Sequence, residues 1–195
     1  MTDAGDDRPA PWWRRLQFAL TNAVYGPGTK TKPWNWLGYE RIAVGNLPTP
    51  ASLPVLRDTV GVTHVVNCRA GAQTAFSGDL YWEERTFGPD RVATAHMWDN
   101  GKPKDPESWA DAALFAAEAL EDPDARVLIH CQRGRRRSVL VAYATLRLRG
   151  HGPDEAAEII LRHRRESHLV PEYRESVEVW LAETGRTTPE PAPTA

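Results

Sequence analysis

Apolar positions along the chain change repeatedly between two spacings. Short apolar runs, such as VTHVVNC at 62–68 and RVLIH at 126–130, are typical of buried strands. Between such runs, apolar residues recur every three or four positions, which is the spacing of one helix face. This pattern predicts strands at 41–45, 62–68, 93–98 and 126–130, and helices at 52–60, 106–120, 136–149, 153–165 and 171–183.

The alternation of strands and helices predicts the fold class. It indicates a single α/β domain with a central, largely parallel sheet and helices on both faces. We expect this domain at 34–184, after an N-terminal extension at 1–33 and before a disordered, Pro-rich tail at 185–195. Ligands of such sheets bind at the carboxyl ends of the strands, so the residues after 126–130 are of special interest.

The N-terminal extension contains a predicted amphipathic helix at 12–25. Two interpretations of it remain open. The helix packs on the domain, as amphipathic helices generally do, or it contacts a membrane surface, as the neighbouring Arg14 and Arg15 would allow. We prefer packing on the domain. The apolar stripe consists of Trp13, Leu16, Leu20 and Val24.

The charge of the chain is uneven. The formal net charge is −2, yet the segment 126–165 has ten Arg and three acidic residues, which leaves −9 for the rest. This favours an anionic ligand at one site and no nucleic-acid partner. Two cysteines, no membrane-spanning apolar run and an acidic N-terminus predict a cytoplasmic protein, which we expect to be a monomer.

The segment after the last predicted strand reads HCQRGRRRS over 130–138. A loop between a buried strand and a helix presents backbone N–H groups, and the helix dipole adds positive potential, so a phosphate group fits there. Gly134 allows the tight backbone path of such a loop. The same loop stabilises a thiolate at Cys131 and makes it nucleophilic. The planar guanidinium of Arg137 can bind two phosphate oxygens.

This loop resembles the signature of the protein tyrosine phosphatase superfamily, a His-Cys pair, five residues, then Arg and Ser or Thr, with Gly three after the Cys. The resemblance implies hydrolysis of phosphate monoesters through a phosphocysteine on Cys131, with Arg137 as the phosphate-binding arginine. It also implies that Ser138 donates to the thiolate, and we expect His130 to support the loop. The backbone amides of the loop should bind phosphate, at Gln132, Arg133, Gly134, Arg135, Arg136 and Arg137.

Protonation of the leaving group requires a carboxylic acid near the loop. Asp99 follows the predicted strand 93–98 and opens a Gly/Pro-rich loop that can reach over the pocket. Its position 32 residues before Cys131 resembles the compact dual-specificity phosphatases. Asp105 is the alternative acid. Because Pro106 follows it, we prefer to interpret Asp105 as a helix N-cap.

The resemblance covers about 36–181 and favours the dual-specificity phosphatase branch. Its implied substrates are phosphotyrosine, phosphoserine and phosphothreonine in proteins. There is a weaker likeness to the subgroup of the mitochondrial phosphatidylglycerophosphate phosphatase, although Gln132-Arg133 replaces the usual Lys-Ala. A phospholipid or inositol phosphate substrate is therefore the alternative. A phospho-binding module without turnover is a third hypothesis, and no residue favours it.

Cys68 ends the predicted strand 62–68. Some relatives form a reversible disulfide between the catalytic cysteine and one in this area, but buried free cysteines are common, so we prefer a core residue. No cofactor is expected. No metal is expected either, because His96, His151, His163 and His168 lack a paired ligand spacing.

Overall fold

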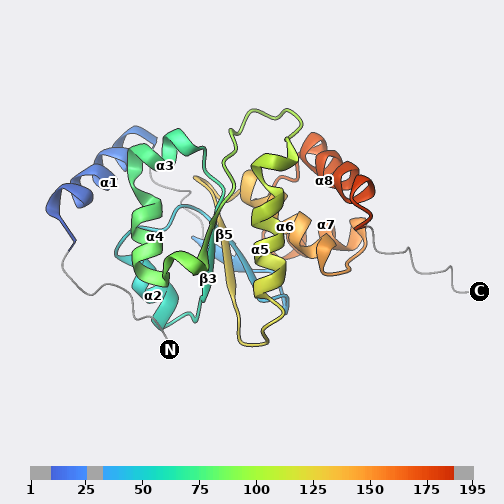
Figure 1. Ribbon diagram of the computed structural model, residues 1–195, viewed down its shortest axis with the longest axis horizontal. Helices are drawn as coiled ribbons and strands as arrows, with labels where there is room; N and C mark the ends of the chain where they lie inside the picture. Colours follow the sequence, from blue (N-terminus) through green and yellow to red (C-terminus); the bar gives the residue numbers. More distant parts are fainter. Residues whose placement is uncertain (1–9, 26–32, 187–195) are drawn as a thin grey trace, which may run out of the picture.

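The computed structural model describes residues 10–25 and 33–186, and it contains a five-stranded sheet (Figure 1). The strand order is β1-β2-β5-β3-β4. All neighbours pair in parallel except β1 and β2, which are antiparallel, so the largely parallel sheet is confirmed. The strands are β1 (Trp34–Trp36), β2 (Ile42–Gly45), β3 (His64–Asn67), β4 (Val92–Thr94) and β5 (Val127–His130).

Helices cover both faces of the sheet (Figure 1). Successive side chains of a strand point to opposite faces, so Val127 and Ile129 of β5 enter one core and Leu128 enters the other. One face carries α1 (Trp12–Tyr25), α2 (Ser52–Asp58), α3 (Gly71–Ser77) and α4 (Asp79–Phe87); the other carries α5 (Ala110–Ala119), α6 (Arg137–Leu148), α7 (Pro153–His163) and α8 (Pro171–Glu183).

The structure differs from the predicted elements mainly between the second and third parallel strands. Sequence patterning did not predict α3 and α4, because α3 buries polar side chains instead of an apolar stripe, among them Gln73, Thr74 and Ser77. The strand predicted at 93–98 ends at Thr94, and the following residues form a loop. The helix predicted at 106–120 is divided into the 3-10 turn η2 (Pro106–Ser108) and α5.

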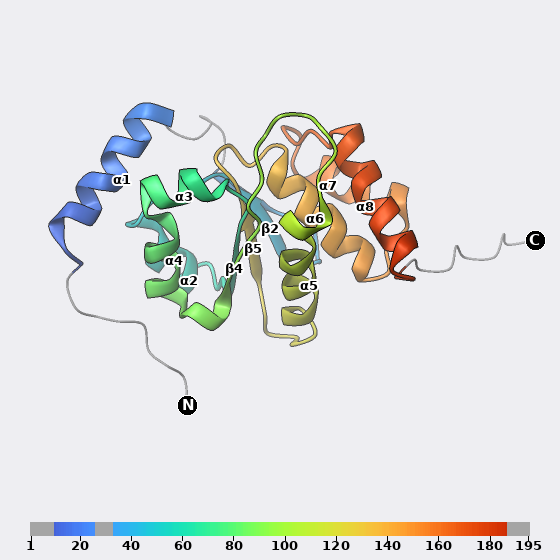
Figure 2. The ribbon, with the colours of Figure 1, turned by 45° about the horizontal axis from the view of Figure 1, so that its top comes forward.

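The N-terminal helix α1 packs on the domain, beside α3 (Figure 2). Its apolar stripe does not face the domain, however. Phe18 is the buried residue, whereas Trp13, Leu16 and Leu20 are exposed, and the side chain of Val24 lies outside the described part. Helix α1 therefore packs on the domain as expected, but through a face other than the apolar stripe. Most of the predicted tail at 185–195 also lies outside the described residues.

Candidate active site

Three parallel strands end side by side at one edge of the sheet. His130, the last residue of β5, is in register with Gly45 of β2 and Asn67 of β3. Cys131 follows directly, and its backbone N–H donates to Gly45 O at 3.3 Å. The loop then turns into α6 at Arg137. The carboxyl edge of the sheet therefore carries the loop that the sequence singled out, as expected for parallel sheets.

Cys131 is buried and its sulfur accepts two hydrogen bonds. The Gly134 N–H donates from 3.2 Å and the Ser138 hydroxyl from 3.4 Å. Burial by itself raises the pKa of Cys131. The charge of Arg137 and hydrogen bonds from Ser138 and from the Arg133 backbone outweigh burial and lower the pKa to about 7. A large fraction of this thiol is therefore ionised near neutral pH.

Gly134 occupies a position that no larger residue fits. Its φ is +61°, in the left-handed region that favours glycine. A Cβ there would lie 2.4 Å from the carbonyl carbon and oxygen of Gly45 and 2.8 Å from Nη2 of Arg164. The loop therefore passes so close to β2 that only glycine allows its path.

Arg137 is held rigidly at the start of α6. Its Nη1 donates to Gln73 Oε1 at 2.8 Å and to the Met97 carbonyl at 3.0 Å. Its Nε is buried and has no hydrogen-bond partner among the described residues. Buried donors are normally satisfied, so this N–H is available for an anion in the pocket. Gln73 was not foreseen from the sequence, because α3 itself was not predicted.

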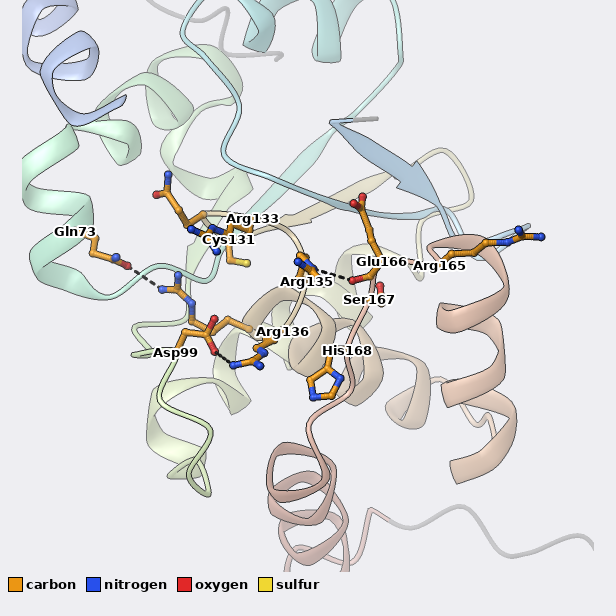
Figure 3. Close-up of a pocket in the computed structure, with 12 residues that line it drawn as sticks. Gln73, Asp99, Cys131, Arg133, Arg135, Arg136, Arg165, Glu166, Ser167 and His168 are labelled. Carbon is orange, nitrogen blue, oxygen red and sulfur yellow. Dashed lines mark hydrogen bonds and ion pairs between the residues drawn. The ribbon is translucent and has the colours of Figure 1, made fainter. Parts of the chain in front are cut away.

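The loop lines a cavity of about 580 Å³. Cys131 lies in it beside the exposed side chains of Arg133, Arg135 and Arg136 (Figure 3). Arg135 contacts the segment after α7, because its Nε donates to the Glu166 carbonyl at 3.1 Å. The remaining lining residues are Gln73, Asp99, Gln132, Arg137, Arg165, Glu166, Ser167 and His168. The cavity is thus strongly cationic, which suits a phosphate ligand.

Asp99 lines the same cavity, and its carboxylate points toward Arg136 (Figure 3). Its Oδ1 accepts from the Tyr173 hydroxyl at 3.2 Å and lies 3.7 Å from Nη1 of Arg136. Two further hydrogen bonds fix the loop to α8, from Gly101 N–H to the Tyr173 hydroxyl at 3.2 Å and from Lys104 N–H to Ser176 Oγ at 2.8 Å. The loop therefore reaches the pocket.

Asp105, the alternative acid, has a different role. It is the N-cap of η2, and its carboxylate accepts from the Glu107 N–H at 3.0 Å. It does not line the cavity. The N-cap interpretation is therefore confirmed.

Behind the loop lies a buried polar cluster. Nε2 of His130 lies 2.9 Å from a carboxylate oxygen of Glu83, and both residues are fully buried. Asn67 donates to the carboxylates of Glu83 and Asp79, at 2.9 Å and 2.8 Å. Arg69 pairs with Asp79 at 2.7 Å. The cluster joins the ends of β3 and β5 to α4, in line with a supporting role for His130.

Arg164 caps the end of α7 and is buried, whereas an arginine at a helix end is usually solvated. It is 1% exposed. Its Nε donates to the Gly134 carbonyl at 2.9 Å, and Nη2 pairs with Glu166 at 2.8 Å. Arg164 therefore connects the segment after α7 to the loop between β5 and α6. Its neighbour Arg165 is exposed at the cavity and extends outward (Figure 3).

Comparison with known proteins agrees with this geometry. No protein-family model matches the chain. Over 115 residues it is 29% identical to dual specificity protein phosphatase 1 of Mus musculus, and equally to that of Rattus norvegicus. The match includes 58% of this chain, which spans only 28% of the length of these curated relatives.

Solved structures show the same fold. The crystal structure of PTPMT1 in complex with PI(5)P superimposes with a TM-score of 0.66 at 20% identity, covering 80% of this chain and 99% of that one. Human DUSP28 gives 0.63 at 16% identity, with 81% and 99% covered. Tk-PTP in the active form gives 0.61 at 25% identity, with 77% and 97% covered. The chain therefore has the fold of the cysteine-based protein tyrosine phosphatases, with structural likeness to PTPMT1, and its sequence is similar to a dual-specificity phosphatase.

Proposed function

We propose that this chain is a phosphatase that hydrolyses phosphate monoesters through a phosphocysteine intermediate on Cys131. The observation that carries the proposal is a buried thiol whose pKa is lowered to about 7, beside an arginine with an unused buried donor. Backbone N–H groups at a helix start and a planar guanidinium are the groups that bind a tetrahedral dianion best.

In the first step the Cys131 thiolate attacks phosphorus. The S–P bond forms while the bond from phosphorus to the leaving oxygen breaks, and Asp99 in its acid form gives its proton to that oxygen. Arg137 and the loop amides stabilise the charge on the phosphoryl oxygens. The lining of one cavity by Cys131, Arg137 and Asp99 supports this assignment.

In the second step the phosphocysteine is hydrolysed. The Asp99 carboxylate accepts a proton from water, whose oxygen attacks phosphorus while the P–S bond breaks. The Ser138 hydroxyl, which lies 3.4 Å from the sulfur, stabilises the departing thiolate. Inorganic phosphate leaves, and both groups return to their starting forms. All these residues come from one chain, which is compatible with a monomer. A reducing compartment such as the cytoplasm suits a free thiol.

The role of Asp99 is tested by varying the leaving group. We expect Asp99→Ala to lower turnover about 10²- to 10³-fold for phosphoserine, a poor leaving group, and less than about tenfold for p-nitrophenyl phosphate. Asp105→Ala is the matched control, because Asp105 caps η2 and does not line the cavity. If Asp99→Ala lowered the turnover of both substrates by the same factor, the acid would have to be another residue.

We propose phosphotyrosine, phosphoserine and phosphothreonine in proteins as the first substrate class. The sequence similarity to dual specificity protein phosphatase 1 supports this choice. A phospholipid or inositol phosphate is the second candidate. It is favoured by the exposed arginines at the cavity, namely Arg133, Arg135, Arg136 and Arg165, and by the structural likeness to PTPMT1 in complex with PI(5)P.

Phosphate release from phosphopeptides and from short-chain lipid phosphates separates the two substrate classes. A preference for the lipid phosphates of about a hundredfold, or about 2.7 kcal/mol, would exclude proteins as the main substrate. The double variant Arg133→Gln/Arg136→Gln sharpens the comparison. The double variant should weaken the binding of multiply charged lipid phosphates more than the binding of singly phosphorylated peptides, because fewer cations then face the extra phosphates.

A further inference from the structure

Helix α1 is attached to the domain by one side. Phe18 is buried against the core on that side, and the Gln17 amide donates to the backbone carbonyls of Phe76 at 2.9 Å and Ala75 at 3.2 Å, at the end of α3. The guanidinium of Arg14 lies over the ring of Tyr81 in α4, 4.5 Å from its centroid. These contacts determine which face of α1 is turned outward.

The outward face is apolar. With 3.6 residues per turn, Trp12, Trp13, Leu16 and Leu20 lie on one face of α1, opposite Phe18. Trp12 is 75% exposed, Leu20 53%, Leu16 50% and Trp13 47%. Single exposed apolar residues are ordinary, but a contiguous apolar face marks an interaction site. This face, defined by these four residues, is the outer face of α1.

Charge and residue type indicate what covers the outer face. Between Asp7 and Glu40 the sequence has five basic residues and no acidic one. Arg15, which is exposed, lies beside the outer face on α1. Tryptophan and leucine on one side of a helix, with arginine at its edge, suit the boundary between lipid headgroups and acyl chains. No helix among the described residues is long and apolar enough to cross a membrane.

The outer face also stands in a fixed relation to the cavity. Helix α1 packs on α3, and Gln73 of α3 lines the cavity and holds Arg137 (Figures 2 and 3). We propose that the outer face of α1 binds the surface of an anionic lipid bilayer and keeps the phosphatase domain there. This binding goes beyond the proposed reaction and does not depend on it, since none of the four residues lines the cavity.

Sedimentation with vesicles tests the proposal. The probes are the full chain, vesicles of phosphatidylcholine, and vesicles of phosphatidylcholine with phosphatidylglycerol. We expect binding to the anionic vesicles, and a loss of affinity of at least about tenfold in Trp12→Ser/Trp13→Ser/Leu16→Ser/Leu20→Ser, because apolar burial drives interfacial binding. The matched control is Leu161→Ser/Val179→Ser, which removes exposed apolar side chains from α7 and α8 and should bind like the wild type.

Two further measurements separate the outcomes. Hydrolysis of p-nitrophenyl phosphate should be unchanged in the α1 variant, so loss of the proposed reaction and loss of membrane binding are distinguishable. Light scattering reports whether the outer face instead joins two copies of the chain. No binding of the wild type to anionic vesicles, or a dimer that only the α1 variant dissociates, would overturn the proposal.

Discussion

Two neighbouring strand ends each carry a buried cysteine, and the two thiols have opposite chemistry. Cys68 follows β3 and is fully buried; Cys131 follows β5 and is 2% exposed. Burial raises the pKa of Cys68 well above its ordinary value, and the nearby Cys131 raises it further. At Cys131, burial also raises the pKa, but the charge of Arg137 and three hydrogen bonds lower it to about 7.

The difference shows that burial alone does not decide the reactivity of a thiol here. What distinguishes Cys131 is the loop that follows it, with the N–H of Gly134 and the hydroxyl of Ser138 directed at the sulfur. Cys68 is followed by the polar cluster of Arg69, Asp79 and Glu83, and its pKa is raised by the charge of Glu83. We therefore expect substitutions at the two positions to have very different effects.

The largest expected effect is on turnover. Cys131→Ser should lower kcat for p-nitrophenyl phosphate by about 10⁴-fold or more, because the nucleophile is lost. Cys68→Ala should keep activity and lower the free energy of unfolding by about 1 kcal/mol, since only a small buried group is removed. Phosphate release and urea unfolding measure the two. Full activity in Cys131→Ser would refute the covalent mechanism.

Next in size is the substitution Arg137→Lys. It keeps the positive charge that lowers the pKa of Cys131 but loses the planar guanidinium. We expect turnover to fall about 10²- to 10³-fold, while the pH at which Cys131 ionises changes little. Arg149→Lys, remote from the cavity, is the control. If Arg137→Lys lowered turnover no more than Arg149→Lys does, the planar guanidinium at position 137 would not be needed for the reaction.

A smaller effect concerns pH. The thiolate fraction of Cys131 rises as pH rises through its pKa, so alkylation by iodoacetamide should reach half its maximal rate at about pH 7. Ser138→Ala should move this midpoint to higher pH, because the charged form loses a hydrogen-bond donor. Cys68 should stay unmodified over the same range. Mass spectrometry of each cysteine peptide measures the alkylation of Cys131 and of Cys68. If the midpoint did not move in Ser138→Ala, Ser138 would not contribute to lowering the pKa of Cys131.

The smallest expected effect is oxidative. With its pKa raised, Cys68 remains a thiol at neutral pH and is a poor partner for exchange. We expect peroxide to oxidise Cys131 without forming a Cys68–Cys131 disulfide. Peptide maps of oxidised and reduced protein are the measurement. A cross-linked peptide would make Cys68 a redox partner of Cys131 and not an inert core residue.

Elements held by contacts between residues close together in the chain could be predicted from the sequence, and elements held by contacts between distant residues could not. The strand at β5, the loop after it and helix α6 are encoded within one short segment, so their pattern was visible directly. Helix α3 could not be recognised in this way, because the side chains that it buries are polar and one of them contacts a distant part of the chain. Gln73, for example, bonds Arg137, which lies 64 positions later. The burial of Arg164 was not visible in the sequence for the same reason, since its partner Gly134 lies 30 positions earlier in the chain.

By itself, the sequence determined the alternating elements, the parallel sheet and the loop at 130–138 with its expected nucleophile and arginine. These depend on local periodicity and on residues close together in the chain. Only the tertiary structure decided which side of α1 is buried, which carboxylate reaches the cavity and which residues hold the loop. Such choices depend on packing between segments far apart in sequence, and a residue's spacing does not report which neighbour it will meet.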